Sequence, residues 1–208
     1  MQKKQVKKLI WILFILCQST FELIAQEKKE WLAYREKHLD ELMSDARKPI
    51  TEEEKKHIKY FKYNKSWKVK AIYTPLEKEP VFQMPTYSGI TRDYRKFATA
   101  TFLHHQKKIT VVLYQNMMLI RQPQFKDYLF LPFKDNTNGK ETYGGGRYMD
   151  VRISTVSNGS IILNFNKAYN PYCAYNEGFN CPIPPSENHL NLSIKAGERN
   201  FKSKRVKK

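Results

Sequence analysis

The stretch FATATFLHHQKKITVVLY, residues 97–114, carries the clearest fold signal in the chain. Two runs rich in β-branched and aromatic residues, 97–103 and 109–114, flank the polar tripeptide Gln106-Lys107-Lys108. Such runs on either side of a short polar connection are typical of a β-hairpin. The stretch therefore predicts two antiparallel strands joined at residues 106–108.

Strand-like runs continue on both sides of this hairpin. Before it, Trp67, Val69, Ala71 and Tyr73 recur at every second position, which is the period of a strand with one buried face. Further runs of the same kind lie at 81–87, 128–133, 148–155 and 161–165. The chain from about Trp67 onward is therefore predicted to be a β-rich domain.

Asn158-Gly159 lies between the last two runs and has the composition of a two-residue hairpin turn. Both residue types tolerate the positive φ that a type I′ turn requires. A hairpin closed at this turn pairs Ile153 with Asn164 and Val151 with Asn166, and we expect that register.

Helical periodicity is confined to the region before the strands. Trp31, Tyr34, His38 and Leu42 recur every three or four residues and predict an amphipathic helix over 27–45. Thr51-Glu52-Glu53-Glu54 has the pattern of a capping box and predicts a second, short helix that ends near residue 60.

The fold class expected is mainly β (α+β): an antiparallel β-sandwich or a partly open barrel, with two N-terminal helices packed on it. We divide the chain into a signal peptide (1–25), an N-terminal helical segment (26–66), a β-rich domain (67–200) and a basic tail (201–208).

Residues 1–25 have the layout of a secretory signal. Four lysines precede the apolar run LIWILFILC at 9–17, and a more polar segment follows up to Ala25. Nine helical residues cover only about 14 Å, less than half of a bilayer's hydrocarbon core. We predict cleavage after Ala25 and export to the periplasm or the medium. Lipid attachment at Cys17 and an uncleaved signal anchor are the alternatives.

Only two cysteines, Cys173 and Cys181, remain after such a cleavage. In an oxidising compartment an even pair predicts a disulfide, and two free buried thiols are the alternative. The spacing does not match that of zinc-binding pairs. No calcium loop, phosphate-binding loop or dinucleotide fingerprint fits the sequence either, so we predict no metal and no cofactor.

The formal net charge of +17 is concentrated at the two ends of the chain. Residues 1–25 carry +3 and residues 201–208 carry +5, which leaves +9 on the body. The basic tail can attract the phosphate groups of an anionic membrane surface. This distribution, together with export, argues against nucleic acid as the partner.

The densest group of candidate functional residues lies at 133–148, in which Asp, Asn, Thr and Gly residues precede Arg147. Asn and Asp form turns through their own backbone hydrogen bonds, and Gly144 to Gly146 permit a close approach of the main chain. Arg147 offers a planar fork for a carboxylate or a phosphate. Asn170 to Asn188, rich in proline and asparagine, is expected to form a long ordered loop.

Four ordered blocks of sequence resemble one bacterial family, catalogued as domain of unknown function 1684 (DUF1684). They are TNGKETYGGGRY at 137–148, NFNKAYNPYCAY at 164–175, CPIPPSEN at 181–188 and AGE at 196–198. The resemblance implies an exported protein of the Bacteroidetes type and assigns no activity. Asn164 departs from the aspartate usual in the family. If that aspartate acts as a general base or a metal ligand in relatives, this chain has lost that role.

The preferred function is an uncharacterised exported domain that binds a small polar molecule or an envelope glycan through the motifs 133–148 and 164–188. The candidate binding residues are Asp135, Thr142, Tyr143, Arg147, Asn166, Tyr169, Asn170 and Glu187. A hydrolase that uses Asp135, Glu141 and Glu187 with Arg147 is one alternative. A purely structural envelope protein is the other, and the sequence does not indicate the oligomeric state.

Overall fold

The computed structural model describes the backbone of residues 2–202 and the side chains of residues 5, 11, 22 and 25–202. The chain divides into two compact units between Asp40 and Glu41. The side chain of Cys17, and most of the basic tail predicted at 201–208, therefore lie outside the described residues.

The described residues contain one α-helix, α1 (Gln2–Ser44), which includes the segment 27–45 predicted to be helical apart from its last residue. Within the part of the chain that is described, no helix is long and apolar enough to cross a membrane.

The prediction of a second N-terminal helix is wrong. Glu54 does accept hydrogen bonds from the backbone N–H and the hydroxyl of Thr51, at 3.0 and 3.1 Å. Only a single 3-10 turn follows, at Lys55–His57. The next residues are extended because they pair with the C-terminal segment: Phe61 N–H donates to Gly197 O and Arg199 N–H donates to Lys59 O. This long-range pairing overrides the local helix signal.

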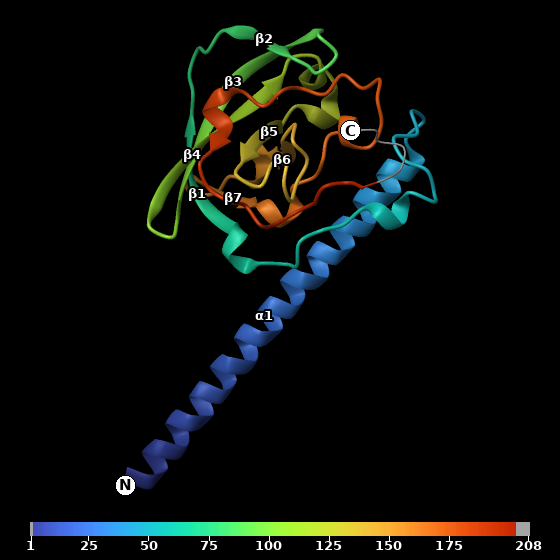
Figure 1. Ribbon diagram of the computed structural model, residues 1–208. Helices are drawn as coiled ribbons and strands as arrows, with labels where there is room; N and C mark the ends of the chain where they lie inside the picture. The colour runs from blue at the N-terminus through green and yellow to red at the C-terminus, as the bar shows by residue number, and fades with distance from the viewer. Residues whose placement is uncertain (1, 203–208) are drawn as a thin grey trace. The chain divides into compact units, whose positions relative to one another are not determined.

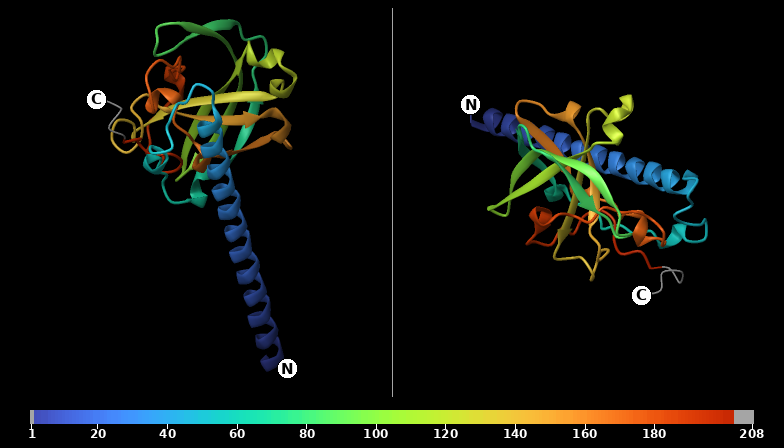
Figure 2. Two further views of the ribbon diagram at one scale, coloured as in Figure 1. Left: turned by 90° about the vertical axis from the view of Figure 1, so that its right-hand side faces the viewer. Right: turned by 90° about the horizontal axis from the view of Figure 1, so that it is seen from above.

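The second unit is built on one eight-stranded, almost entirely antiparallel sheet, which curls into a half-barrel (Figure 1, Figure 2). Of the two predicted architectures, a β-sandwich and a partly open barrel, the structure supports the partly open barrel. The strands are β1 (Lys68–Pro75), β2 (Val81–Pro85), β3 (Thr91–His104), β4 (Lys107–Asn116), β5 (Tyr128–Asp135), β6 (Arg147–Arg152), β7 (Ser160–Asn164) and β8 (His189–Leu190). The main order is β6-β5-β4-β3-β1-β7, with β2 paired to β3 and β8 paired in parallel to β5.

The hairpin predicted at 97–114 is confirmed as β3–β4, although its connection is shorter than expected. His104 pairs with Lys107, so the turn consists of His105 and Gln106 rather than residues 106–108. Both turn residues have positive φ, 46° and 62°. This conformation matches the twist of the paired strands and permits a two-residue connection.

Asn158 and Gly159 also form the predicted turn, with φ of 48° and 65°, but the predicted register is wrong. The pairing stops at the bridge between Ser157 and Ser160, because a 3-10 turn at Ile153–Thr155 ends β6. Strand β7 pairs with β1 instead, through Leu163 with Val69 and Ile161 with Ala71. Two strands that are neighbours in sequence thus form the opposite edges of the main sheet path.

The two faces of the sheet carry separate clusters of buried residues. The inward face holds the main core, which includes Leu113, Leu131, Met149 and Leu163, and the C-terminal residues Ile194 and Ala196 belong to it. The other face of β3 to β6 carries a second, aromatic cluster that includes Tyr94, Tyr114, Phe130, Tyr148 and Cys181.

Asn188 fills a gap in this sheet. β4 and β5 share only one registered pair, Tyr114 with Phe130. The Asn188 side chain accepts from Val112 N–H at 2.8 Å and donates to the carbonyls of Val112 and Pro132 at 2.9 and 2.8 Å. The amide therefore replaces the missing strand-to-strand hydrogen bonds and fixes the loop that precedes β8.

Candidate functional site

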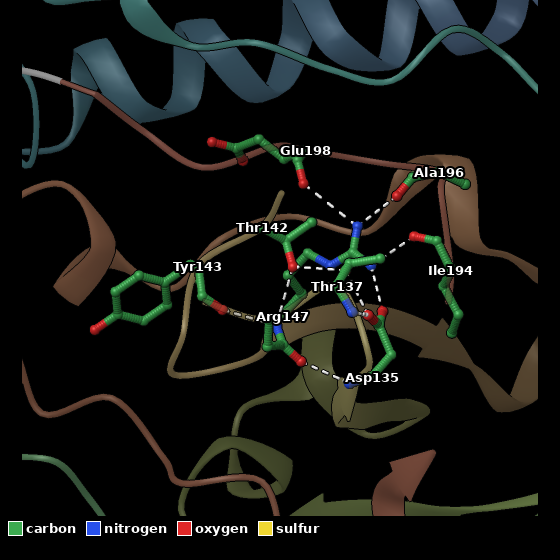
Figure 3. Close-up of polar contacts among 9 residues, drawn as sticks. Asp135, Thr137, Thr142, Tyr143, Arg147, Ile194, Ala196 and Glu198 are labelled. Carbon is green, nitrogen blue, oxygen red and sulfur yellow. Dashed lines mark hydrogen bonds and ion pairs between the residues drawn. The ribbon is translucent and has the colours of Figure 1, made fainter. Parts of the chain in front are cut away.

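Arg147, the first residue of β6, is fully buried at the end of the barrel core. It lies on the same side of β6 as Met149 and Val151, so it points inward. Its Nη2 atom lies 2.6 Å from Oδ2 of Asp135, and neither side chain is exposed. The guanidinium also donates to the carbonyls of Ile194, Ala196 and Glu198, as Figure 3 shows.

Burial lowers the pKa of Arg147, and the neighbouring Asp135 carboxylate opposes that shift. A guanidinium nevertheless stays cationic over the working range of proteins. Its charge is balanced inside the fold by one carboxylate and several carbonyl oxygens. The side chain therefore has little capacity left for an external ligand.

The polar turn after β5 is built around the same carboxylate (Figure 3). Thr137 donates both its backbone N–H and its hydroxyl to Oδ1 of Asp135. The hydroxyls of Thr137 and Thr142 share a hydrogen bond of 2.8 Å. Asn138 accepts from the Asp135 N–H at 2.6 Å and donates to the carbonyl of Tyr143 at 2.7 Å. The motif at 137–148 thus holds Asp135 in position against Arg147.

One further candidate residue is also engaged within the fold. Asn166 accepts from Asn64 N–H and donates to Asn64 O, both at 2.9 Å, and so fixes a segment about a hundred residues away. Asn164 accepts from the backbone N–H of Asn166 at 3.2 Å and caps the 3-10 turn that follows. An aspartate at position 164 would accept the same hydrogen bond, so the departure from the family pattern keeps this contact.

Asn170 belongs to a second buried polar cluster, centred on Glu198. The Glu198 carboxylate accepts from the backbone N–H and the side-chain amide of Asn170 at 3.0 and 2.9 Å, and from the hydroxyl of Tyr175 at 2.7 and 2.8 Å. Burial raises the pKa of Glu198 to about 7, while these hydrogen bonds and the charge of Arg147 act in the opposite direction.

This raised pKa predicts that the domain becomes less stable as the pH rises. Between the ordinary value of 4.5 and about 7, the folded state holds a proton that the unfolded state has released. We expect Glu198 to lower the free energy of unfolding by about 3 kcal/mol between about pH 5 and about pH 8. Urea denaturation at both pH values measures the difference.

Glu198→Gln should remove most of that dependence, because the amide does not titrate. Glu187→Gln is the matched control, since Glu187 is exposed and forms an ion pair with Lys96 at 2.7 Å. An equal pH dependence in the wild type and in Glu198→Gln would contradict the assignment.

The remaining candidate residues lie nearer to solvent. Tyr143 is half-buried, and Glu141 forms an ion pair with Lys195 at 3.0 Å. The three acids of the hydrolase hypothesis thus have three different cationic partners: Arg147 for Asp135, Lys195 for Glu141 and Lys96 for Glu187. The structure shows no hydrogen bond that joins any two of these acids.

Tyr169 is the candidate residue that leads to an accessible polar group. Its hydroxyl donates to Oδ1 of Asp150 at 2.6 Å, and the hydroxyl of Tyr128 donates to the same oxygen at 2.8 Å. Asp150 is exposed, and both tyrosines are half-buried. No hydrogen bond to the second oxygen, Oδ2, is found within residues 25–202.

The surroundings of Asp150 are nevertheless crowded. Burial raises its pKa, and the two tyrosine hydroxyls and Arg152 oppose the shift. Water thus reaches the carboxylate, while neighbouring protein atoms also desolvate it. Burial likewise raises the pKa of Tyr128 well above its usual range, so this hydroxyl stays protonated and remains a donor.

Aromatic side chains gather on the same outward face of the sheet as this carboxylate. Phe130 and Tyr148 meet edge to face with 4.7 Å between ring centroids, and Phe125 meets Tyr128 in the same way at 5.8 Å. We call the set Asp150, Tyr128, Tyr169, Phe125 and Arg152 the Asp150 face. The sequence contains a signal for it: Tyr148, Asp150 and Arg152 alternate with the inward-facing Arg147, Met149 and Val151.

The predicted disulfide between Cys173 and Cys181 is present. The disulfide closes the loop that covers the aromatic cluster. Tyr148, a member of that cluster, donates its hydroxyl to the carbonyl of Pro182 in the loop. Among the described residues, no group of three or more histidine, cysteine, aspartate or glutamate side chains is placed to hold a metal ion.

Residues 53–199 match the model of a family described as a protein of unknown function (DUF1684). The chain is also similar to an uncharacterised protein from Haloarcula marismortui, whose structure was solved in solution by NMR. The two are 31% identical with a TM-score of 0.63, and the match covers 84% of this chain and 96% of that one. No curated protein is significantly similar to the chain. The chain belongs to the DUF1684 family of proteins of unknown function.

Proposed function

We propose that this chain is an exported DUF1684 domain that binds a small polar ligand, of the class of envelope glycans, at the Asp150 face. One observation carries the proposal: an accessible carboxylate has one oxygen fixed by two tyrosine hydroxyls and the other without a hydrogen bond in the described structure. The proposal moves the site from the buried motif at 133–148 to the outward side of β6.

The chemistry of this face suits a sugar. A fixed carboxylate oxygen accepts hydrogen bonds from sugar hydroxyls, and the half-buried rings of Tyr128 and Tyr169 offer surfaces for the C–H face of the ring. The tyrosine hydroxyls also hold the carboxylate in one orientation before the ligand arrives, which lowers the entropic cost of binding.

The Cys173–Cys181 disulfide supports export, because such bonds persist in oxidising compartments and are rare in the cytosol. The signal-like layout of residues 1–25 supports the same location. A periplasmic or secreted protein of the Bacteroidetes type would meet glycans of the cell envelope, and this is the setting we propose.

The test is a thermal-shift and calorimetric screen of the wild-type chain with N-acetylglucosamine and muramyl dipeptide as probes. A probe present at about 100 times its dissociation constant should raise the free energy of unfolding by about 2.7 kcal/mol. We expect Asp150→Asn to weaken binding at least 30-fold, because truncating a hydrogen-bonded charge costs about 2–5 kcal/mol.

Glu187→Gln is the matched control, because it neutralises an exposed carboxylate that lies outside the Asp150 face and forms an ion pair with Lys96 at 2.7 Å. Tyr169→Phe should weaken binding less than Asp150→Asn, since Tyr128 still holds the carboxylate. Binding that survives Asp150→Asn unchanged, or a wild type that no probe stabilises, would refute a glycan site at this face.

A further inference from the structure

A second accessible surface lies on the outward side of the opposite half of the sheet, over β7, β1, β3 and β4. The inward residues of these strands, such as Ala71 and Val111, belong to the main core. Three outward residues are large aliphatics that remain exposed: Ile72 at 64%, Leu103 at 69% and Ile162 at 49%. Apolar side chains gathered on a surface in this way mark an interaction site.

Lysines alternate with these aliphatic residues across the strands. Lys70 pairs with Ile162, and Lys108 pairs with Leu103, so each cation stands beside an exposed apolar side chain. Ile72 pairs with Ser160 on one side and with Thr101 on the other. We call this set the Lys70 face: Lys70, Ile72, Leu103, Lys108 and Ile162.

The Lys70 face has no acidic counterpart on its own strands. β1, β4, β7 and β3 from Ala98 onward contain no aspartate or glutamate. Lys70 and Lys108 are both exposed, and the described structure gives neither an ion-pair partner. A positive surface with aliphatic side chains between its cations is complementary to a layer of anionic headgroups above hydrocarbon.

We infer that the Lys70 face docks on the surface of an anionic phospholipid bilayer. Ile72, Leu103 and Ile162 enter the boundary between headgroups and acyl chains. The lysine ammonium groups contact lipid phosphates, while the lysine methylene chains lie along the apolar surface. The inference stands apart from the glycan proposal, because the Lys70 face and the Asp150 face share no residue.

The full-length chain is sedimented with phosphatidylcholine vesicles, with and without phosphatidylglycerol. The partition coefficient for the anionic vesicles should fall at least about 25-fold in Lys70→Glu/Lys108→Glu, since each lysine near an anionic surface contributes about fivefold. Replacing Ile72, Leu103 and Ile162 together with serine should lower it about tenfold or more. Lys126→Glu/Lys140→Glu, which reverses two exposed lysines elsewhere, is the matched control.

Each alternative occupant gives a different result. If only the lysine reversals weaken binding, the occupant is a soluble polyanion, and the inference that the face docks on a bilayer is refuted. If the serine variant changes the oligomeric state without vesicles, the occupant is a second copy of the chain. If both sets of variants bind like the control while a chain that ends at Lys202 does not bind, the C-terminal tail is the anchor and the inference fails.

Discussion

Replacing Arg147 with methionine is expected to lower the free energy of unfolding by about 3–5 kcal/mol. The substitution removes the cation but leaves the fully buried carboxylate of Asp135 without its charge partner. It also leaves the carbonyls of Ile194 and Ala196 without their donor. Urea denaturation with linear extrapolation measures the loss.

Arg152→Met is the matched control. Arg152 and Asp127 form an ion pair at 2.8 Å, but both side chains are about two-fifths exposed. Exposed pairs contribute about 0–1 kcal/mol, so this variant should remain close to the wild type. Similar losses in the two variants would show that the buried pair is not what makes Arg147 important.

The double variant Arg147→Met/Asp135→Leu separates charge from hydrogen bonding. Removing both ions relieves the unpaired buried charge, and such exchanges are often neutral. Here recovery should be partial, because Asp135 also accepts the backbone N–H and the hydroxyl of Thr137. A complete recovery would mean that those two hydrogen bonds contribute little.

Strand positions could be predicted from the sequence because each strand buries one face and so alternates in polarity. Trp67, Val69 and Ala71 show that period, and all three are buried on the inward side. What failed depends on distant partners. The capping box at Thr51 cannot reveal that residues 59–61 pair with residues 197–199, nor can Asn158-Gly159 reveal that β7 pairs with β1.

The site was harder to predict for a chemical reason. Arginine, aspartate, asparagine and threonine bind ligands, but they also satisfy one another inside a tight buried turn, and composition alone does not separate these roles. Asp135 and Arg147 proved to be partners of each other. Asp150, the centre of the proposed site, is an isolated acid in a strand, and only the alternation of β6 marks it as outward-facing.

Replacing Gly146 with alanine is expected to lower the free energy of unfolding by about 3 kcal/mol. Gly146 has φ of +96°, where side chains are rarely tolerated, and an added Cβ would lie 2.7 Å from both the Phe133 carbonyl oxygen and Pro184 Cγ. The Phe133 carbonyl is part of β5, which pairs with β6 at Arg147, so it cannot move away without disturbing that pairing.

Gly159→Ala separates backbone strain from this steric conflict. Gly159 has φ of +65°, but no atom lies within 4 Å of its added Cβ, so only the left-handed backbone opposes the substitution. That conformation costs about 1–2 kcal/mol for a residue with a side chain. Gly146→Ala should therefore lose clearly more stability than Gly159→Ala in the same urea series. Equal losses would mean that strand β5 and Pro184 yield to the methyl group, and that the close approach at Gly146 does not fix the position of Arg147.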